Sequence, residues 1–165
     1  MYINCKTYYS FRYGTISTEE LISTAVDKGI STLALTNINS TCDVWEFVKL
    51  SHEVGIKPIA GVEVRNEDEF LYILIATNNK GLAWIHAFLS EHLIEKKPFP
   101  NAATFFENNE DGFVIYSLNA KPLPELLPNE KIGVLPWEVN ILRKGQNSES
   151  FSLRSSLIYP LRSIN

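Results

Sequence analysis

Short apolar runs alternate with amphipathic stretches along this chain, and the alternation is typical of repeated βα units. Ser17 and Glu20 have the spacing of a capping box, in which each side chain accepts a hydrogen bond from the other residue's backbone N–H. We therefore expect a helix that opens at Ser17 and ends near Gly29. The apolar positions on its buried face are Leu21, Ile22, Ala25 and Val26.

Polar caps, glycine and proline mark three further helices. Ser40 or Thr41 is expected to cap a helix that closes at Gly55. Its apolar positions are Val44, Trp45, Phe47, Val48 and Val54. Asn78 or Asn79 caps a helix over residues 80–92, and Pro136 suits the first turn of one that runs to about residue 144. The segment 96–104, with two prolines, is the one we expect to be disordered.

The expected strands are 2–7, 31–36, 56–65, 70–76, 113–118, 131–135 and 156–161. Residues 66–69 turn the chain, so the strand 70–76 should run antiparallel to the one before it and form one β-hairpin near residues 62–76. Strands that otherwise alternate with helices predict an α/β fold, most simply a distorted, TIM-like (β/α) barrel, short or incomplete. We expect residues 1–165 to form a single domain.

Composition excludes several classes of protein. The chain has 165 residues, of which 45% are hydrophobic and 21% charged, so it is neither disordered nor collagen-like. Its apolar runs are shorter than the roughly 20 residues that a membrane span needs, and the first residues lack the pattern of a signal peptide. Two cysteines, Cys5 and Cys42, make no disulfide framework, which favours a cytoplasmic protein. A net charge of −4 argues against autonomous binding to nucleic acid.

Chemistry in barrels of this kind lies at the carboxyl ends of the strands. Asn4 and Lys6 lie there on one face of the first strand, two residues apart. Asn37 and Ile38 end the second strand, and Glu63 follows the start of the third. These are the candidate site residues.

Three stretches of this sequence together carry a family resemblance. Residues 4–14 read N-C-K-T-Y-Y-S-F-R-Y-G, residues 34–39 read A-L-T-N-I-N, and residues 55–63 read G-I-K-P-I-A-G-V-E. They resemble H-x-H-S-x-Y-S-x-x-D-G, A-L-T-D-H-x and G-I-K-P-I-x-G-x-E of the PHP (polymerase and histidinol phosphatase) domain at the N-terminus of the bacterial DNA polymerase III alpha subunit. The resemblance is good over residues 2–89 and weak from residue 98 onward.

The resemblance implies a metal site, but the ligand residues are changed. PHP enzymes hold a cluster of divalent metal ions with histidines and carboxylates. The corresponding positions here are Asn4, Lys6, Tyr13, Asn37, Ile38, Glu63 and Leu71. Only Glu63 keeps a ligand side chain, and catalytic metals need anionic or imidazole ligands. We therefore expect these to be vestigial metal-site positions, with no metal, no cofactor and no catalytic residue in this domain.

Lys6 suggests what replaces the metal. Its ammonium is expected to pair with Glu63, with Asn4 and Asn37 as neutral hydrogen-bond partners, because an unpaired buried carboxylate is costly. The alternative is that Lys6 points into solvent at a strand end.

The other candidate groups give weaker indications of function. His52, His86 and His92 lack the three- or four-residue spacing that brings ligands to one face of a helix, so we interpret them as surface or structural residues. Cys5 alternates with the site residues and should be a buried, inert thiol. The aromatic residues of the segment 8–13, with Arg12, either stack on single-stranded nucleic acid or pack over the barrel mouth or a neighbouring domain.

The resemblance implies that the parent protein is a DNA-directed DNA polymerase, a nucleotidyltransferase of replication. We expect this part of it to be a noncatalytic scaffold. The implied partners are the remaining polymerase domains and a proofreading exonuclease subunit, with DNA contacted only through the parent protein and no membrane. One alternative is a metal-dependent PHP phosphoesterase or exonuclease whose unusual ligands are Glu63, Asp43 and Asn37. Another is a free-standing protein-interaction module.

Overall fold

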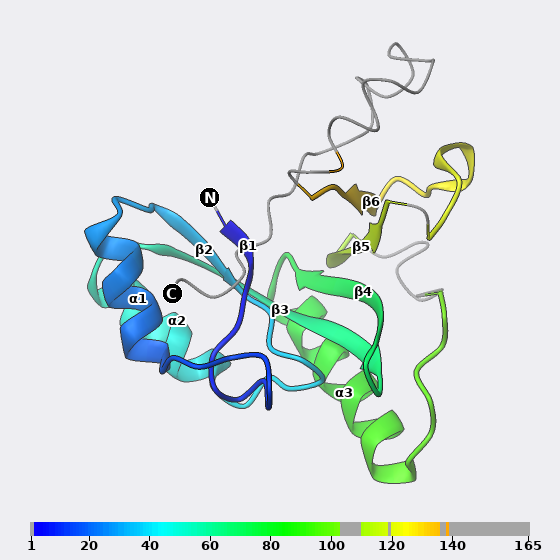
Figure 1. Cartoon of the computed structure of the whole chain (residues 1–165), viewed down its shortest axis with the longest axis horizontal. Helices are drawn as coiled ribbons and strands as arrows, with labels where there is room; N and C mark the ends of the chain where they lie inside the picture. The colour runs from blue at the N-terminus through cyan, green and yellow to red at the C-terminus, as the bar shows by residue number, and fades with distance from the viewer. Residues whose placement is uncertain (1, 103–109, 119, 136–137, 139–165) are drawn as a thin grey trace.

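The computed structural model of the chain describes residues 2–102, 110–118, 120–135 and 138. Its elements follow the chain in the order drawn in Figure 1. They are β1 (Tyr2–Cys5), α1 (Thr18–Asp27), β2 (Thr32–Leu35), α2 (Val44–Glu53), β3 (Lys57–Asn66), β4 (Glu69–Ala76), α3 (Asn79–Glu95), β5 (Gly112–Ser117), the 3-10 turn η2 (Leu123–Glu125) and β6 (Glu130–Gly133). The expected helix at 136–144 and the expected strand at 156–161 lie outside the described residues.

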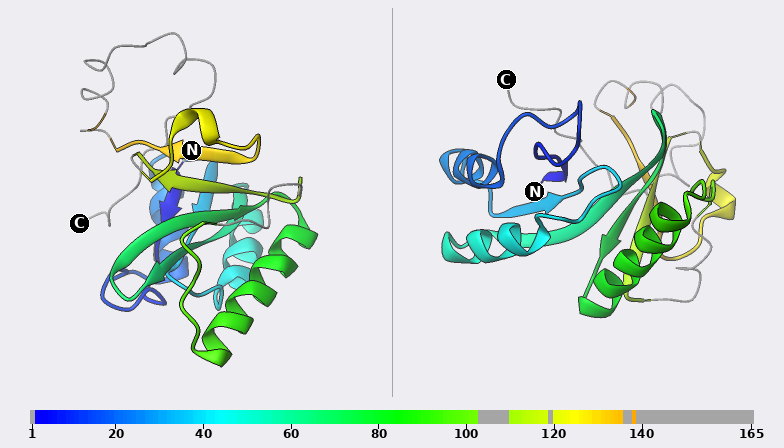
Figure 2. Two further views of the ribbon diagram at one scale, coloured as in Figure 1. Left: turned by 90° about the vertical axis from the view of Figure 1, so that its right-hand side faces the viewer. Right: turned by 90° about the horizontal axis from the view of Figure 1, so that it is seen from below.

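One mixed sheet holds all six described strands in chain order. β1, β2 and β3 are parallel neighbours, β3 and β4 form the expected antiparallel hairpin, β4 and β5 are also antiparallel, and β5 and β6 are parallel. The sheet curls into a half-barrel, as Figure 2 shows from two sides. The prediction of an α/β fold is confirmed. The regular alternation of parallel strands and helices that defines a TIM-like barrel is not confirmed. Only two residues join β3 to β4, and so short a turn can join only antiparallel strands.

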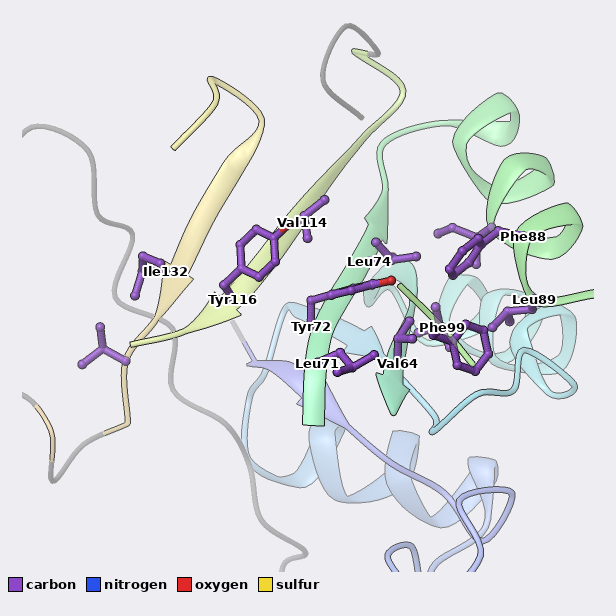
Figure 3. Packing of buried hydrophobic residues seen from close by; sticks show 13 residues of the cluster. Val64, Leu71, Tyr72, Leu74, Phe88, Leu89, Phe99, Val114, Tyr116 and Ile132 are labelled. Carbon is purple, nitrogen blue, oxygen red and sulfur yellow. The ribbon is translucent and has the colours of Figure 1, made fainter. Parts of the chain in front are cut away.

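Two apolar clusters cover the outer face of the sheet. α1 and α2 pack on β1 and β2 through Leu21, Phe47 and Leu35, with Cys5 among them. α3 packs on the hairpin and β5 in a second cluster (Figure 3). Its members include Val62, Val64, Leu71, Tyr72, Leu74, Ile85, Phe88, Leu89, Phe99, Val114, Tyr116 and Ile132.

The inner face of the sheet carries a third cluster. Ile73 and Ile75 of β4 and Ile115 of β5 are buried there, with Ile3 and Ile59 packed against them. Glu63 pairs with Ile73 across the β3–β4 ladder, so its side chain belongs to this inner face. The outer layer of helices thus supports a sheet whose inner face holds the candidate site.

The structure confirms the capping box and corrects several details. Ser17 Oγ accepts from the backbone N–H of Glu20 at 3.1 Å, and the Glu20 carboxylate accepts from the backbone N–H of Ser17 at 2.9 Å. The N-cap of α2 is Asp43, not Ser40 or Thr41. Val26, which was expected on the buried face of α1, is exposed instead, and Trp45 and Val54, two of the apolar positions of the second helix, are exposed as well.

The segment expected to be disordered is ordered over the part that the structure describes. Phe99 is buried among the side chains of α3, and its ring stacks on His92. Asn66 fixes the backbone of Phe99 by accepting its N–H and donating to its carbonyl, at 2.8 and 2.9 Å. Residues 103 and 104 lie outside the described residues. The contacts of Phe99 with α3 and Asn66 therefore hold this segment in place, contrary to the expected disorder.

The two cysteines differ in burial, and this gives a first prediction. Burial raises the pKa of the Cys5 thiol to about 12, whereas Cys42 is exposed. Since the thiolate is the reactive form, we expect a thiol reagent at pH 8 to modify Cys42 rapidly and Cys5 only at the rate of unfolding. Mass spectrometry of trypsin fragments after timed labelling measures both rates. Equal labelling of the two cysteines in the folded protein would contradict the placement of Cys5.

In the part of the chain that the structure describes, no helix is long and apolar enough to cross a membrane.

Candidate functional site

Glu63 is the centre of a charged cluster on the inner face. Its side chain is 1% exposed, and each of its two oxygens faces a cation. Lys6 Nζ lies 2.6 Å from Glu63 Oε2, and Arg65 Nε lies 2.5 Å from Glu63 Oε1. The expected pairing of Lys6 with Glu63 is therefore present, and the alternative of a solvent-directed Lys6 is wrong.

Asn4 completes the cluster as a neutral bridge. Its Oδ1 accepts from Lys6 Nζ at 2.7 Å and from Thr36 Oγ1 at 2.7 Å, and its Nδ2 donates to Glu63 Oε2 at 3.2 Å. The amide thus holds both members of the ion pair at once, as expected.

Local strand geometry brings these groups together. Residues two apart in a strand share a face, so Asn4 lies beside Lys6, and Glu63 beside Arg65. Ile38 bridges to Glu63 in parallel, which extends the pairing of the second and third strands as far as the site. Asn39 then fixes the backbone of Arg65, accepting from its N–H and donating to its carbonyl, both at 2.9 Å.

The net charge of the cluster is +1. Lys6 and Arg65 carry two positive charges against the single carboxylate of Glu63. Burial lowers the pKa of Lys6, and the charge of Glu63 and its hydrogen bond oppose that shift, while Arg65 adds to it. Lys6 is held in place because its ammonium has two close acceptors, Glu63 and Asn4.

Asn37 belongs to a second, neighbouring network and not to the Lys6 cluster. The prediction that Asn37 is a hydrogen-bond partner of the Lys6–Glu63 pair is therefore wrong. Its Oδ1 accepts from the backbone N–H of Thr7 at 2.8 Å and from Ser10 Oγ at 2.7 Å. Its Nδ2 donates to Asp43 Oδ1 at 2.7 Å. The Asn37 backbone carbonyl accepts from the N–H of Glu63, which is its link to the first cluster.

Asp43 is the anchor of this second network. It is 2% exposed, and its Oδ2 accepts from Thr7 Oγ1 at 2.7 Å and from Thr18 Oγ1 at 2.9 Å. The carboxylate therefore ties together the loop after β1, the start of α1 and the start of α2. Asp43 and Glu63 each have a full set of separate partners.

Tyr13 reaches the first cluster only through Arg65. The guanidinium carbon of Arg65 lies 4.4 Å from the centre of the Tyr13 ring, and the Tyr13 hydroxyl donates to Asp68 Oδ1 at 3.1 Å. Leu71, by contrast, is not brought to the site. It lies in the apolar cluster under α3, because a bulge at Val64/Arg65 shifts the register and puts Ile73 opposite Glu63.

Several residues of the site were missed in the sequence. Arg65 carried a signal, since it stands two residues after Glu63 in an alternating strand. The sequence suggests Asp43 only as a metal ligand, and Thr7, Ser10 and Thr18 give no signal in a single sequence. His52, His86 and His92 lie on α2 and α3. Within the described ranges, no group of three or more histidines, cysteines or carboxylates is placed to hold a metal ion.

Comparison with known proteins identifies the family of this chain. Residues 3–122 match the PHP domain. An error-prone DNA polymerase of Symbiobacterium thermophilum is 30% identical over 98 residues, which are 59% of this chain and 9% of that polymerase. DNA polymerase III subunit alpha of Buchnera aphidicola is 33% identical over 79 residues, or 44% of this chain and 7% of that protein. The chain thus spans less than a tenth of the length of these relatives.

Among solved structures, an amidohydrolase from Chromobacterium violaceum is similar with a TM-score of 0.42 and 20% identity. The match covers 58% of this chain and 34% of that one.

Proposed function

Because this chain belongs to the PHP domain family, we propose that it is the PHP domain at the N-terminus of a DNA polymerase III alpha subunit, in a noncatalytic form that serves as a scaffold. The similarity to the alpha subunit of Buchnera aphidicola and to an error-prone polymerase supports the parent protein. The parent would extend DNA in replication, in the cytoplasm, with residues that lie elsewhere in its chain.

The pairing of Glu63 with two cations is the observation that carries the noncatalytic assignment. A divalent metal needs free carboxylate oxygens or imidazole nitrogens, and it uses its charge to activate bound water. Lys6 and Arg65 occupy both oxygens of Glu63, and an ammonium at this position repels a metal ion. The residues present therefore do not fit the metal cluster of the family, and the positions of Asn4, Lys6 and Glu63 are best explained as a vestigial metal site.

Metal titration tests this assignment. Calorimetry of the full chain with manganese or zinc is expected to show no saturable binding, and the chain is expected not to hydrolyse bis(p-nitrophenyl) phosphate with either metal present. A metal-dependent phosphatase run in parallel shows that the assay works. Stoichiometric binding together with metal-dependent hydrolysis would establish instead the alternative of a phosphoesterase with unusual ligands such as Glu63, Asp43 and Asn37.

The scaffold role implies protein partners. We propose the remaining polymerase domains and a proofreading exonuclease subunit, following the family. Gel filtration of the chain mixed with the exonuclease subunit of the same organism is expected to give a joint peak. Separate elution would exclude the exonuclease as a partner of this domain and leave the metal result untouched.

A further inference from the structure

Apart from Tyr13, which lies against Arg65, four large aromatic side chains are exposed on the loop after β1 and in the first turn of α2. Phe11 is 82% exposed, Trp45 71%, Tyr8 50% and Tyr9 41%. Tyr8, Tyr9 and Phe11 come from the loop after β1, drawn in dark blue in Figure 1, and Trp45 comes from the first turn of α2. We call these four residues the aromatic surface. Aromatic residues are enriched at the centre of protein interfaces, so four of them left in water need an explanation.

The loop that carries Tyr8, Tyr9 and Phe11 is held in place by hydrogen bonds and by a close backbone contact. Thr7 at its start is bonded to Asp43 of the second network, and the backbone N–H of Tyr8 donates to the carbonyl of Ile16 at 2.9 Å. Gly14 closes the loop so tightly that a Cβ there would lie 1.7 Å from the carbonyl oxygen of Thr7. A loop that is ordered before binding loses little conformational entropy on binding, which favours a recognition surface.

Negative charge borders the aromatic surface. Glu19 lies in the first turn of α1, and Glu46 lies in the first turn of α2, next to Trp45 in the sequence. The pKa of Tyr8 is raised mainly by its hydrogen bond with Tyr9 and to a smaller extent by the charges of Glu19 and Glu46. In the described part of the chain, neither carboxylate forms an ion pair. The one cation of this loop, Arg12, lies over the Phe11 ring, 5.8 Å from its centre.

We propose that the aromatic surface binds a basic segment of a partner protein. Arginine or lysine side chains would stack on Tyr8 and Tyr9 and pair with Glu19 and Glu46, which combines cation–π attraction with opposite charge. Apolar side chains of the same segment would cover Phe11 and Trp45. Single-stranded nucleic acid also stacks on aromatic rings, but its phosphates would be repelled by the two carboxylates. The proposal goes beyond the proposed function, since it depends on exposed residues outside the Lys6 cluster.

Fluorescence anisotropy with defined probes tests the proposal on the full chain. The probe is a short fluorescein-labelled peptide in which arginine alternates with leucine. The same peptide with glutamate in place of arginine, and a labelled oligothymidylate, are the comparison probes. The arginine peptide is expected to bind, more weakly as salt rises, and the other two are not. Amide NMR shifts on binding should centre on residues 8–13, 19, 45 and 46.

Variants locate the binding. Tyr9→Ala and Trp45→Ala are each expected to weaken binding of the arginine peptide about tenfold, and Glu46→Gln roughly threefold with a flatter salt dependence. Val54→Ala and Glu53→Gln at the far end of α2 are matched controls that should leave it unchanged, and circular dichroism verifies that each variant is folded. Three results would overturn the proposal: no binding of the arginine peptide, equal binding by all variants, or tighter binding of the oligothymidylate. None of them bears on metal binding, so the two proposals fail separately.

Discussion

Glu63→Gln is expected to lower the free energy of unfolding by about 3 kcal/mol, because it leaves two cations without their counter-charge. The Glu63 side chain is 1% exposed, while those of Lys6 and Arg65 are 15% and 16% exposed. Because water reaches the two cations in part, the decrease in the free energy of unfolding should lie at the low end of the range for breaking a buried ion pair. Urea denaturation followed by circular dichroism measures it.

Two further variants separate charge from packing at Glu63. Lys6→Met should cost less than Glu63→Gln, since the carboxylate then keeps Arg65 as its partner. Glu69→Gln lies on the same hairpin but in an exposed position, and it should change stability by less than about 0.5 kcal/mol. If Glu63→Gln were as mild as Glu69→Gln, the ion cluster would have no structural role.

Asp43→Ala is the second large effect that we expect, with a loss of about 2–4 kcal/mol. The substitution leaves three buried donors without their acceptor, on Thr7, Thr18 and Asn37, and each unsatisfied group costs about 1–3 kcal/mol before local relaxation. Glu53→Ala, on the exposed face of the same helix, is the control and should be nearly neutral.

Hydrogen exchange gives Asp43→Ala a second readout. The backbone N–H of Thr7 donates to Asn37, which Asp43 holds in place, so this amide should exchange faster in the variant than the amides of α3 do. Unchanged stability, or unchanged exchange at Thr7, would mean that Asp43 does not anchor the loop.

The sequence predicted the parts of this protein that depend on local periodicity. The capping box at Ser17 and Glu20 and the β3–β4 hairpin follow from spacing within one or two elements. The pairing of Lys6 with Glu63 was predicted instead from the family resemblance, which places both residues at positions of one metal site. Side chains alternate between the two faces of a strand, so Asn4 and Lys6 lie on one face of the sheet. Glu63 of β3, the third of the parallel strands, lies on the same face.

The features that were missed depend on contacts between distant segments. Asn37 was expected beside Lys6, but Thr7, Ser10 and Asp43 offer it a complete set of partners on the neighbouring network. Phe99 follows a short charged segment and a proline (residues 95–98), and its burial depends on its contacts with α3 and Asn66. A bulge in the hairpin moved Leu71 to the outer cluster. The sequence of a single chain does not indicate any of these contacts.

Diffraction from crystals soaked in manganese tests the central claim most directly, namely that Lys6 and Arg65 pair with both oxygens of Glu63 and leave none free for a metal ion. Anomalous scattering locates manganese without reference to the protein atoms. We predict no anomalous peak at Glu63, with Lys6 Nζ and Arg65 Nε each within hydrogen-bond distance of a different Glu63 oxygen. An anomalous peak at the Glu63 carboxylate, with Lys6 turned away from it, would contradict the claim.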